Sequence, residues 1–318
     1  ADLITASAGT SNVRIGVNAG NSIQSGGNYN VVVGDEAGTA ITTGDNNTFV
    51  GYASGDAQTT ASNNTFLGYA TGSAVNTGRK NTFVGSTAGD ALTSSDFNVA
   101  VGADALTADT LGSKSVGVGT GALAAQNFTT ATDSLNTAVG NNAGLSVTTG
   151  IYNTLIGGQA GDALTDADYN VAVGGAALSS DTLGSRSVAI GTSALTDQNF
   201  TTSTDAYNVA VGHNAGKSVT TGQKNNLIGG LAGDALTTGD KNVALGYLAL
   251  SADTKGFQNV AIGTAALGSQ NFTTEVSSYN VAIGDEAGTS VTTGIKNIFI
   301  GGLAGDATTD ADENVAIG

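Results

Sequence analysis

The sequence contains no proline, cysteine, methionine or tryptophan, and only 5% of its 318 residues are aromatic. A chain with so few bulky side chains cannot fill the deep centre of an ordinary globular domain, although its length alone would suit about two domains. It does contain 48 glycines and 40% hydrophobic residues, mostly Ala, Val, Ile and Leu, so it is not a disordered polar tract. This composition favours thin, regular, closely packed layers.

Positive charge is also scarce, since ten Lys and Arg residues stand against 26 Asp and Glu, for a formal net charge of −16. Nucleic-acid and anionic membrane surfaces are bound by clustered cations, and only Arg79 and Lys80 are adjacent here, so we expect neither partner. No apolar run approaches the roughly 20 residues that span a bilayer, so we expect no membrane insertion. The acidic balance suits a protein of the extracellular space, a cell surface or a virion surface.

A short repeat of the form Asn-x-x-(Val/Ile/Leu)-Gly-x-x-Ala runs from end to end. Its glycine, here called the coil glycine, recurs after 17 residues thirteen times, after 18 once and after 21 three times. The 21-residue intervals begin at Gly119, Gly191 and Gly263, so a 72-residue repeat of four coils lies over the basic one. A 17-residue unit is too short for a helix pair or a propeller blade but suits one solenoid turn. We therefore predict an all-β chain, with residues 1–318 forming one continuous parallel β-solenoid of about 18 coils.

A short strand is expected directly before each coil glycine. The residue before the glycine is always aliphatic, and the residue two places earlier is Val, Ile or Thr except at Asn226. We interpret these two flanking positions as the buried face of the strand. The glycine would then supply a corner that needs a positive φ or leaves no room for a Cβ.

Asparagine stands four residues before the coil glycine in 16 of 18 coils, and Ser115 and Ser187 stand there in the others. In stacked coils such amides lie above one another and can hydrogen-bond from coil to coil as a ladder. The expected ladder includes Asn98, Asn136, Asn153, Asn170, Asn208, Asn225 and Asn242.

The middle strand residue, between the two flanking positions, is apolar in every coil but the first, which has Arg14. If it points away from the coil interior, it makes an apolar stripe that a soluble monomer rarely exposes, and hence a subunit interface. The alternative is a second internal face covered by the loops of the same chain. The candidate interface residues are Phe49, Phe66, Phe83, Leu155, Leu227 and Phe299.

Chemistry-bearing residues are few. His213 is the one histidine and lies in a variable position after a coil glycine, which indicates a solvated turn. We expect no enzyme and no cofactor. Incidental Ca²⁺ binding by Asp166 with Asp168, or by Asp310 with Asp312, stays open, and an ice-binding solenoid is a weaker alternative because Thr-Thr-Gly runs are missing from many coils.

The three 21-residue coils carry an insert with the sequence Gln-Asn-Phe-Thr-Thr. Insertions in solenoids become loops on one face, often the binding face. The alternative, which we favour for the phenylalanines, is that their rings pack against the solenoid or a neighbouring subunit while the divergent residues after them face solvent. The candidate interaction residues are Gln126, Asn127, Phe128, Gln198, Asn199, Phe200, Gln270, Asn271 and Phe272.

Two groups of coils resemble known fibres. Residues 187–195 (Ser-Val-Ala-Ile-Gly-Thr-Ser-Ala-Leu) and 259–267 resemble the head repeats of YadA-like trimeric autotransporter adhesins, and residues 47–55 resemble phage tail-fibre repeats. The resemblance covers the whole chain, although the coil is longer than that of the adhesin heads. It implies a left-handed β-roll, a homotrimer and attachment to a glycan or protein receptor on a host or surface. The stalk, membrane anchor and terminal chaperone domain of such fibres are not in this sequence, which we expect to be part of a longer fibre.

Two functions follow as expectations. In the first, the solenoid is an adhesive shaft with its own receptor contacts. In the second, it is a passive spacer or filament, and attachment resides in another domain.

Overall fold

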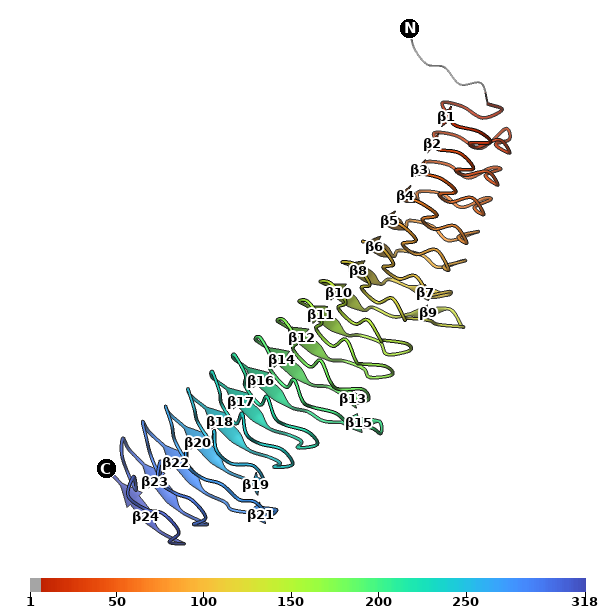
Figure 1. Cartoon of the computed structure of the whole chain (residues 1–318). Coiled ribbons are helices and arrows are strands. Elements are labelled where there is room, and N and C mark those ends of the chain that lie inside the picture. Colours follow the sequence, from red (N-terminus) through yellow and green to blue (C-terminus); the bar gives the residue numbers. More distant parts are fainter. Residues whose placement is uncertain (1–6) are drawn as a thin grey trace. The chain divides into compact units, whose positions relative to one another are not determined.

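The computed structural model describes residues 7–318 and is an all-β protein without a helix in that range. It is a parallel β-solenoid of about 18 coils, each with one three-residue strand, which confirms the predicted fold class (Figure 1). The chain divides into two compact units, Ala1–Asn153 and Thr154–Gly318, which are described separately. Since the described residues contain no helix, none of them forms a helix that could cross a membrane.

Unit 1 contains one parallel sheet with a strand from each coil. Consecutive strands pair in register, one coil apart, so that Thr48, Phe49 and Val50 lie beside Thr65, Phe66 and Leu67. The strands of this sheet are β1 (Val13–Ile15), β2 (Val31–Val33), β3 (Thr48–Val50), β4 (Thr65–Leu67), β5 (Thr82–Val84), β6 (Val99–Val101), β8 (Val116–Val118) and β10 (Thr137–Val139).

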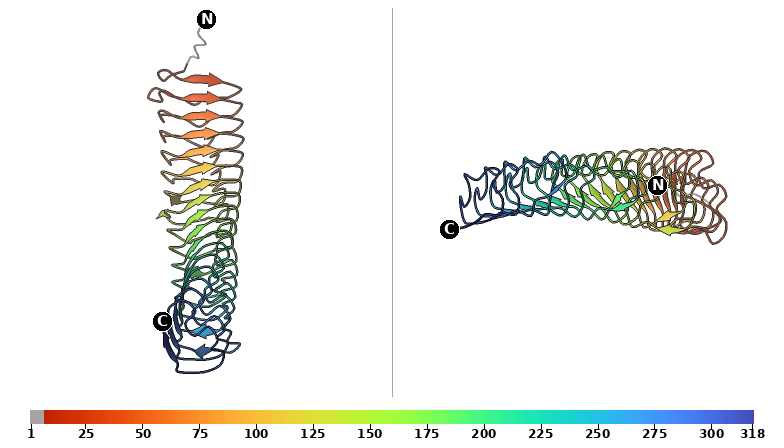
Figure 2. Two further views of the ribbon diagram at one scale, coloured as in Figure 1. Left: turned by 90° about the vertical axis from the view of Figure 1, so that its left-hand side faces the viewer. Right: turned by 90° about the horizontal axis from the view of Figure 1, so that it is seen from below.

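Unit 2 repeats this arrangement, and Figure 2 shows strands stacked with a common direction. Its strands are also paired one coil apart, for example Val188 with Val209 across a 21-residue coil. They are β11 (Thr154–Ile156), β12 (Val171–Val173), β14 (Val188–Ile190), β16 (Val209–Val211), β17 (Asn226–Ile228), β18 (Val243–Leu245), β20 (Val260–Ile262), β22 (Val281–Ile283), β23 (Ile298–Ile300) and β24 (Val315–Ile317).

The coil glycine makes the corner that ends each strand. Gly34 has a φ of 133°, and a Cβ at this position would lie 2.5 Å from the carbonyl oxygen of Gly51 in the next coil. Any other residue would therefore be strained and would also push neighbouring coils apart. The alanine three residues later, such as Ala37 or Ala232, is completely buried inside the turn.

The middle residue of each strand points into the coil, so the predicted orientation of the strands is wrong. Phe49, Phe66, Phe83, Leu155 and Leu227 are 0% exposed and Phe299 is 1% exposed within the single chain. The Phe49, Phe66 and Phe83 rings stack from coil to coil with centroids 4.9 Å apart.

These six residues form the core and cannot contact another subunit. The error has a physical cause, because both faces of each short strand are apolar. A period of two separates the faces but does not say which one is inside.

The side chain of the asparagine four residues before each coil glycine bonds its coil to the following one. Asn242 Nδ2 donates to the carbonyl of Gly256 at 2.8 Å, and its Oδ1 accepts the backbone N–H of Asn259 at 3.0 Å. Most hydrogen bonds of the ladder thus join an asparagine side chain to the backbone, rather than one asparagine side chain to another. The same contacts recur at the completely buried residues Asn98, Asn136, Asn170, Asn208 and Asn225. Asn153 is also completely buried, and its backbone N–H donates to Asn136 Oδ1 at 2.9 Å.

Candidate interaction surfaces

The three inserts leave the solenoid as loops and return through a two-residue strand. In unit 1, β7 (Gly112–Ser113) pairs with β9 (Thr132–Asp133). In unit 2, β13 (Gly184–Ser185) pairs with β15 (Thr204–Asp205), and β19 (Gly256–Phe257) pairs with β21 (Val276–Ser277). Each insert is therefore fixed at its return as well as at its start.

The insert phenylalanines pack against their own solenoid. Phe128, Phe200 and Phe272 are 5–6% exposed. The ring of Phe200 lies over Gly184 in the preceding coil, where a Cβ would come within 2.7 Å of a ring carbon. The carbonyl of Phe200 accepts hydrogen bonds from Thr182 Oγ1 at 2.9 Å and from the backbone N–H of Leu183 at 3.1 Å. These rings anchor the loops.

The insert glutamines are buried as well, so two of the three residue types proposed to contact a partner cannot do so. Gln126, Gln198 and Gln270 are 0% exposed. Only Asn127, Asn199 and Asn271 are exposed, together with the tips that follow the phenylalanines, residues 129–131, 201–203 and 273–275. The shared Thr-Thr pair thus belongs to the exposed tip, not to the anchor.

A buried aspartate that was not expected from the sequence holds each insert in place. Gln270 Nε2 donates to Asp253 Oδ2 at 2.6 Å, and Asn280 Nδ2 donates to Gln270 Oε1 at 2.8 Å. Asp253 Oδ1 accepts the backbone N–H groups of Gly256 at 3.0 Å and Phe272 at 3.1 Å. The same directional chain begins at Asp181 and at Asp109.

Burial raises the pKa of Asp109 and Asp253, because the ionised carboxylate loses hydration. The hydrogen bonds from the glutamine side chains and from backbone N–H groups oppose that rise in pKa. One signal in the sequence could have identified these residues: each Asp precedes an insert glutamine by 17 residues, one coil.

The remaining titratable side chains do not converge on a site. Asp56, Asp162 and Asp234 each keep one carboxylate oxygen buried without a hydrogen bond, and burial raises the pKa of each. Asp162 and Asp234 lie four coils apart in unit 2, about 19 Å at the usual coil spacing. His213 is exposed.

Nothing in residues 7–318 groups three or more His, Cys, Asp or Glu side chains as a metal ion would require. Of the residues considered for Ca²⁺, Asp312 Oδ1 accepts the backbone N–H of Ile295 at 2.8 Å, and the backbone N–H of Asp168 donates to Ser185 Oγ at 3.0 Å. These contacts join neighbouring coils.

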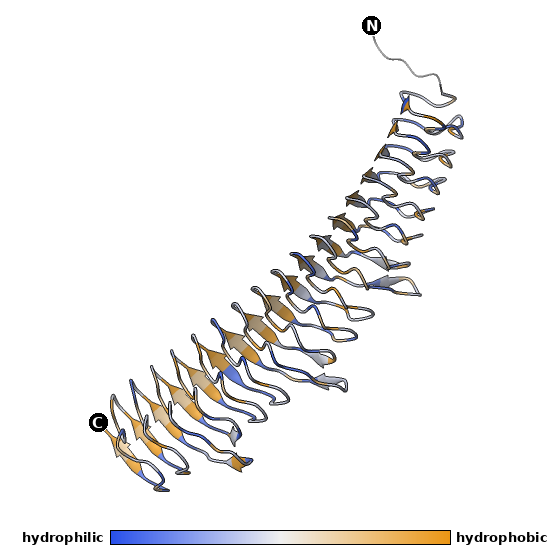
Figure 3. Ribbon diagram, viewed as in Figure 1, coloured by the Kyte–Doolittle hydropathy of each residue, from blue (hydrophilic) through white to orange (hydrophobic). Residues whose placement is uncertain are grey.

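The outward face of the sheet in each unit is apolar, and it consists of the two flanking positions of every strand. Figure 3 shows the strands as the hydrophobic part of the coils. In unit 2, 18 of the 20 outward residues are Val, Ile or Leu, and the others are Thr154 and Asn226. In unit 1, twelve of 16 are aliphatic and four are Thr. None of these outward residues of the described strands is charged.

No protein-family model matches the chain, and no curated protein sequence is similar to it.

Proposed function

We propose that this protein is the shaft of an extracellular, cell-surface or virion fibre, assembled from three copies of the chain and used for attachment to a host or surface. The outward faces of the two units would be buried between the copies. Attachment would use the surfaces that remain exposed.

The observation that carries this proposal is the uncharged outward face in a chain of net charge −16. Parallel sheets occur almost only with both faces covered, and strands covered on both sides read as continuous apolar runs. The strands here read Val-Ala-Ile, Thr-Phe-Val or Ile-Phe-Ile, yet outward residues such as Ile190, Ile228 and Leu245 are 38–43% exposed in the single chain.

A second copy of the same chain fits this face. The ten strands of unit 2 present 20 outward side chains, which matches the roughly 20–30 residues per partner of a stable interface. A second copy also has the same coil repeat, so a single alignment of the two chains brings every coil of one copy beside a coil of the other. Three copies around one axis is what the resemblance to YadA-like heads implies.

The test is the mass of the intact chain in solution, measured by light scattering at micromolar concentration. We expect about three times the chain mass for the parent. The double variant Ile190→Lys/Ile228→Lys should dissociate, because unpaired charge is costly to bury. The control Thr202→Lys/Thr221→Lys adds the same charge at exposed loop positions and should keep the parent mass.

A parent that is a well-folded monomer at this concentration contradicts the proposal. Circular dichroism of each variant shows whether a loss of mass reflects dissociation or unfolding. Dissociation of the control to the same extent would mean that added charge, not its position on the outward face, separates the copies.

A further inference from the structure

The residue five places before each coil glycine lies directly before the asparagine ladder and beside the outward face. We call these residues the pre-strand row. All nine in unit 2 have a positive φ, between 52° and 63°. Eight of them are exposed and Gln258 is partly exposed. The row in unit 2 consists of Tyr169, Arg186, Tyr207, Lys224, Lys241, Gln258, Tyr279, Lys296 and Glu313.

Backbone hydrogen bonds join neighbouring coils at or next to this row. The backbone N–H of Lys224 donates to the carbonyl of Ala206 at 2.8 Å, and that of Lys241 donates to the carbonyl of Gln223 at 2.9 Å. Arg186, Gln258, Lys296 and Glu313 are bonded in the same way to the residue that precedes the row in the neighbouring coil. At the two insert-bearing coils the residue before the row makes the bond instead: the backbone N–H of Ala206 donates to the carbonyl of Ser185 at 3.0 Å, and that of Ser278 to the carbonyl of Phe257 at 3.1 Å. Successive side chains consequently follow at the coil spacing of about 4.8 Å.

The composition of the row is not explained by its backbone conformation. Positive φ favours Gly and Asn, and bulky side chains there are strained. Across the described coils, twelve of 18 row positions nevertheless hold an aromatic residue, Lys or Arg, including six of the ten cations of the chain. The position two after the coil glycine also has a positive φ in all 17 described coils that contain it, and it holds no aromatic residue and no cation.

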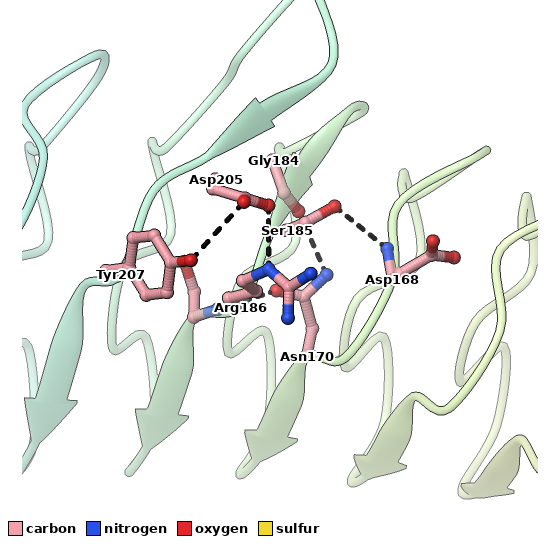
Figure 4. Close-up of polar contacts among 8 residues, drawn as sticks. Asp168, Asn170, Gly184, Ser185, Arg186, Asp205 and Tyr207 are labelled. Atoms are coloured by element: carbon pink, nitrogen blue, oxygen red, sulfur yellow. Dashed lines mark hydrogen bonds and ion pairs between the residues drawn. The ribbon is translucent and has the colours of Figure 1, made fainter.

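Aromatic rings and a cation form a continuous exposed platform at one end of the row. The Arg186 guanidinium lies 4.8 Å from the ring centroid of Tyr169 and 6.0 Å from that of Tyr207. Asp205 fixes it from the side, accepting from Arg186 Nε at 2.9 Å and from the Tyr207 hydroxyl at 3.3 Å (Figure 4). Tyr207 is still 49% exposed.

Two lysines in the middle of the row lack a counter-ion. Ion pairs neutralise the row cations Lys114, Arg186 and Lys296. Lys224 and Lys241 lie in adjacent coils and have no such pair; the carboxylate of Asp240 instead accepts the backbone N–H of Gln223 at 2.7 Å. Like charges one coil apart repel each other, so an anion placed between these ammonium groups would be favourable.

We propose that the pre-strand row of unit 2, from Tyr207 to Tyr279, binds an extended acidic polysaccharide. The sugar rings lie against Tyr207 and Tyr279, and the carboxylates of the polymer accept hydrogen bonds from Lys224 and Lys241. A row with one exposed side chain per coil fits a linear polymer. Two free cations suit a polymer of moderate charge density better than a nucleic acid, which requires many phosphate contacts.

This inference specifies the attachment role of the proposed function, but it does not depend on self-association. The probes are polymers of galacturonate, mannuronate and glucuronate, titrated calorimetrically into the intact protein. The methyl ester of the galacturonate polymer keeps the rings and removes the charge. We expect the parent to bind at least one uronate polymer, the galacturonate ester at least about tenfold more weakly than its acid, and binding to weaken with added salt.

Variants locate the site. Lys224→Gln/Lys241→Gln and, separately, Tyr207→Asn should each weaken binding at least about tenfold, and Asn tolerates the positive φ. The control Lys217→Gln/Lys255→Gln removes the same charge from positions outside the row and should bind like the parent.

The inference is overturned if no uronate polymer binds, or if the galacturonate ester binds as tightly as its acid. It is also overturned if the control variant loses as much affinity as the row variants, or if single-stranded DNA binds more tightly than the uronate polymers. If the parent binds no polymer and the row variants unfold at a lower temperature than the parent, the row serves only to hold the coils together. Light scattering separates this result from the proposed function. A trimer that binds no polymer contradicts only the polysaccharide site, and a monomer that binds it contradicts only the assembly.

Discussion

Two kinds of coil alternate within unit 2, and they fill the same interior differently. In the coil of Gly229, the inward strand residue is Leu227, and Gly233 and Leu236 follow in the turn. A Cβ on Gly233 would lie 2.7 Å from a Leu227 methyl and 2.9 Å from a Leu236 methyl, so this plain coil has no room for a larger residue.

In the next coil the small and large residues change places between the strand and the turn. Its inward residue is Ala244, and Leu250 occupies the place equivalent to Gly233. Both are 0% exposed. Because Leu250 now fills the centre, the place equivalent to Leu236 holds Asp253, which is buried against Gln270 of the following coil.

The comparison shows how a uniform solenoid acquires a loop without losing its core. The large interior side chain is supplied by the turn instead of by the strand, so the interior stays closely packed. One core position is then available for a polar anchor. The 72-residue period repeats this exchange at Asp181 and Gln198 and, in unit 1, at Asp109 and Gln126.

The largest expected effect tests whether the insert is part of the core in these coils. Phe200→Ala should lower the free energy of unfolding by about 3–5 kcal/mol, because a buried ring is lost and a cavity is left. Tyr247→Ala, at a residue 55% exposed, is the matched aromatic control and should change stability by less than about 0.5 kcal/mol. Guanidinium unfolding measures both; equal midpoints for the two variants would place the ring outside the core.

A smaller loss is expected for the asparagine ladder, which both kinds of coil share. Asn225→Leu in a plain coil and Asn242→Leu in the next should each cost about 1–3 kcal/mol, because backbone groups of neighbouring coils lose their partners. Asn141→Leu, at an exposed position outside the ladder and without a positive φ, is the control and should cost less. A cost confined to one kind of coil would show that the ladder is not a common element.

The period, the coil length, the glycine corner and the asparagine spacing could all be predicted from the sequence, because each is a steric or hydrogen-bonding demand repeated in every coil. Which face of each strand points into the coil could not be predicted. In Thr48–Val50 all three side chains suit an apolar surface, so only the closure of the coil decides that Phe49 is inside.

Of the candidate site residues, the inserts could be identified from the sequence, but not which of their atoms are exposed. From sequence alone, an aspartate in a short polar segment is expected to be solvated. Asp253 is buried because Leu250 fills the centre of the coil. The pre-strand row was equally hidden. Tyr207 and Lys224 carry no signal in the sequence until their positive φ and shared exposed edge are known.

A further effect on stability is expected from pH. Burial raises the folded-state pKa of Asp109 and Asp253 above the unfolded value near 4, so the folded chain holds these protons more tightly. Their contribution to stability is full below about pH 4 and is lost as the pH rises through the folded-state pKa of each carboxyl.

The unfolding midpoint should therefore fall as the pH rises above about 4. Asp56, Asp162 and Asp234, whose pKa values burial also raises, add to this fall with the same sign. Asp109→Asn/Asp253→Asn should have a shallower pH dependence than the parent. Asp197→Asn/Asp306→Asn removes the same charge from exposed positions and serves as control. A double variant with the parent's slope would show that these two carboxyls titrate alike in the folded and unfolded chain.

The smallest effect on stability is expected at the insert tips, which are the part of the insert-bearing coils that plain coils lack. Residues 129–131, 201–203 and 273–275 are exposed and lie between the phenylalanine anchor and the returning strand. Replacing all three tips with Gly and Ser should shift the free energy of unfolding by less than about 0.5 kcal/mol per site. Loops held by a rigid scaffold often carry binding, so attachment of the proposed fibre to a surface should weaken. Binding of uronate polymers in solution should stay unchanged, because Lys224 and Lys241 are untouched. A loss of stability comparable to that of Phe200→Ala would mean that the tips, and not only the rings, hold the insert to the solenoid.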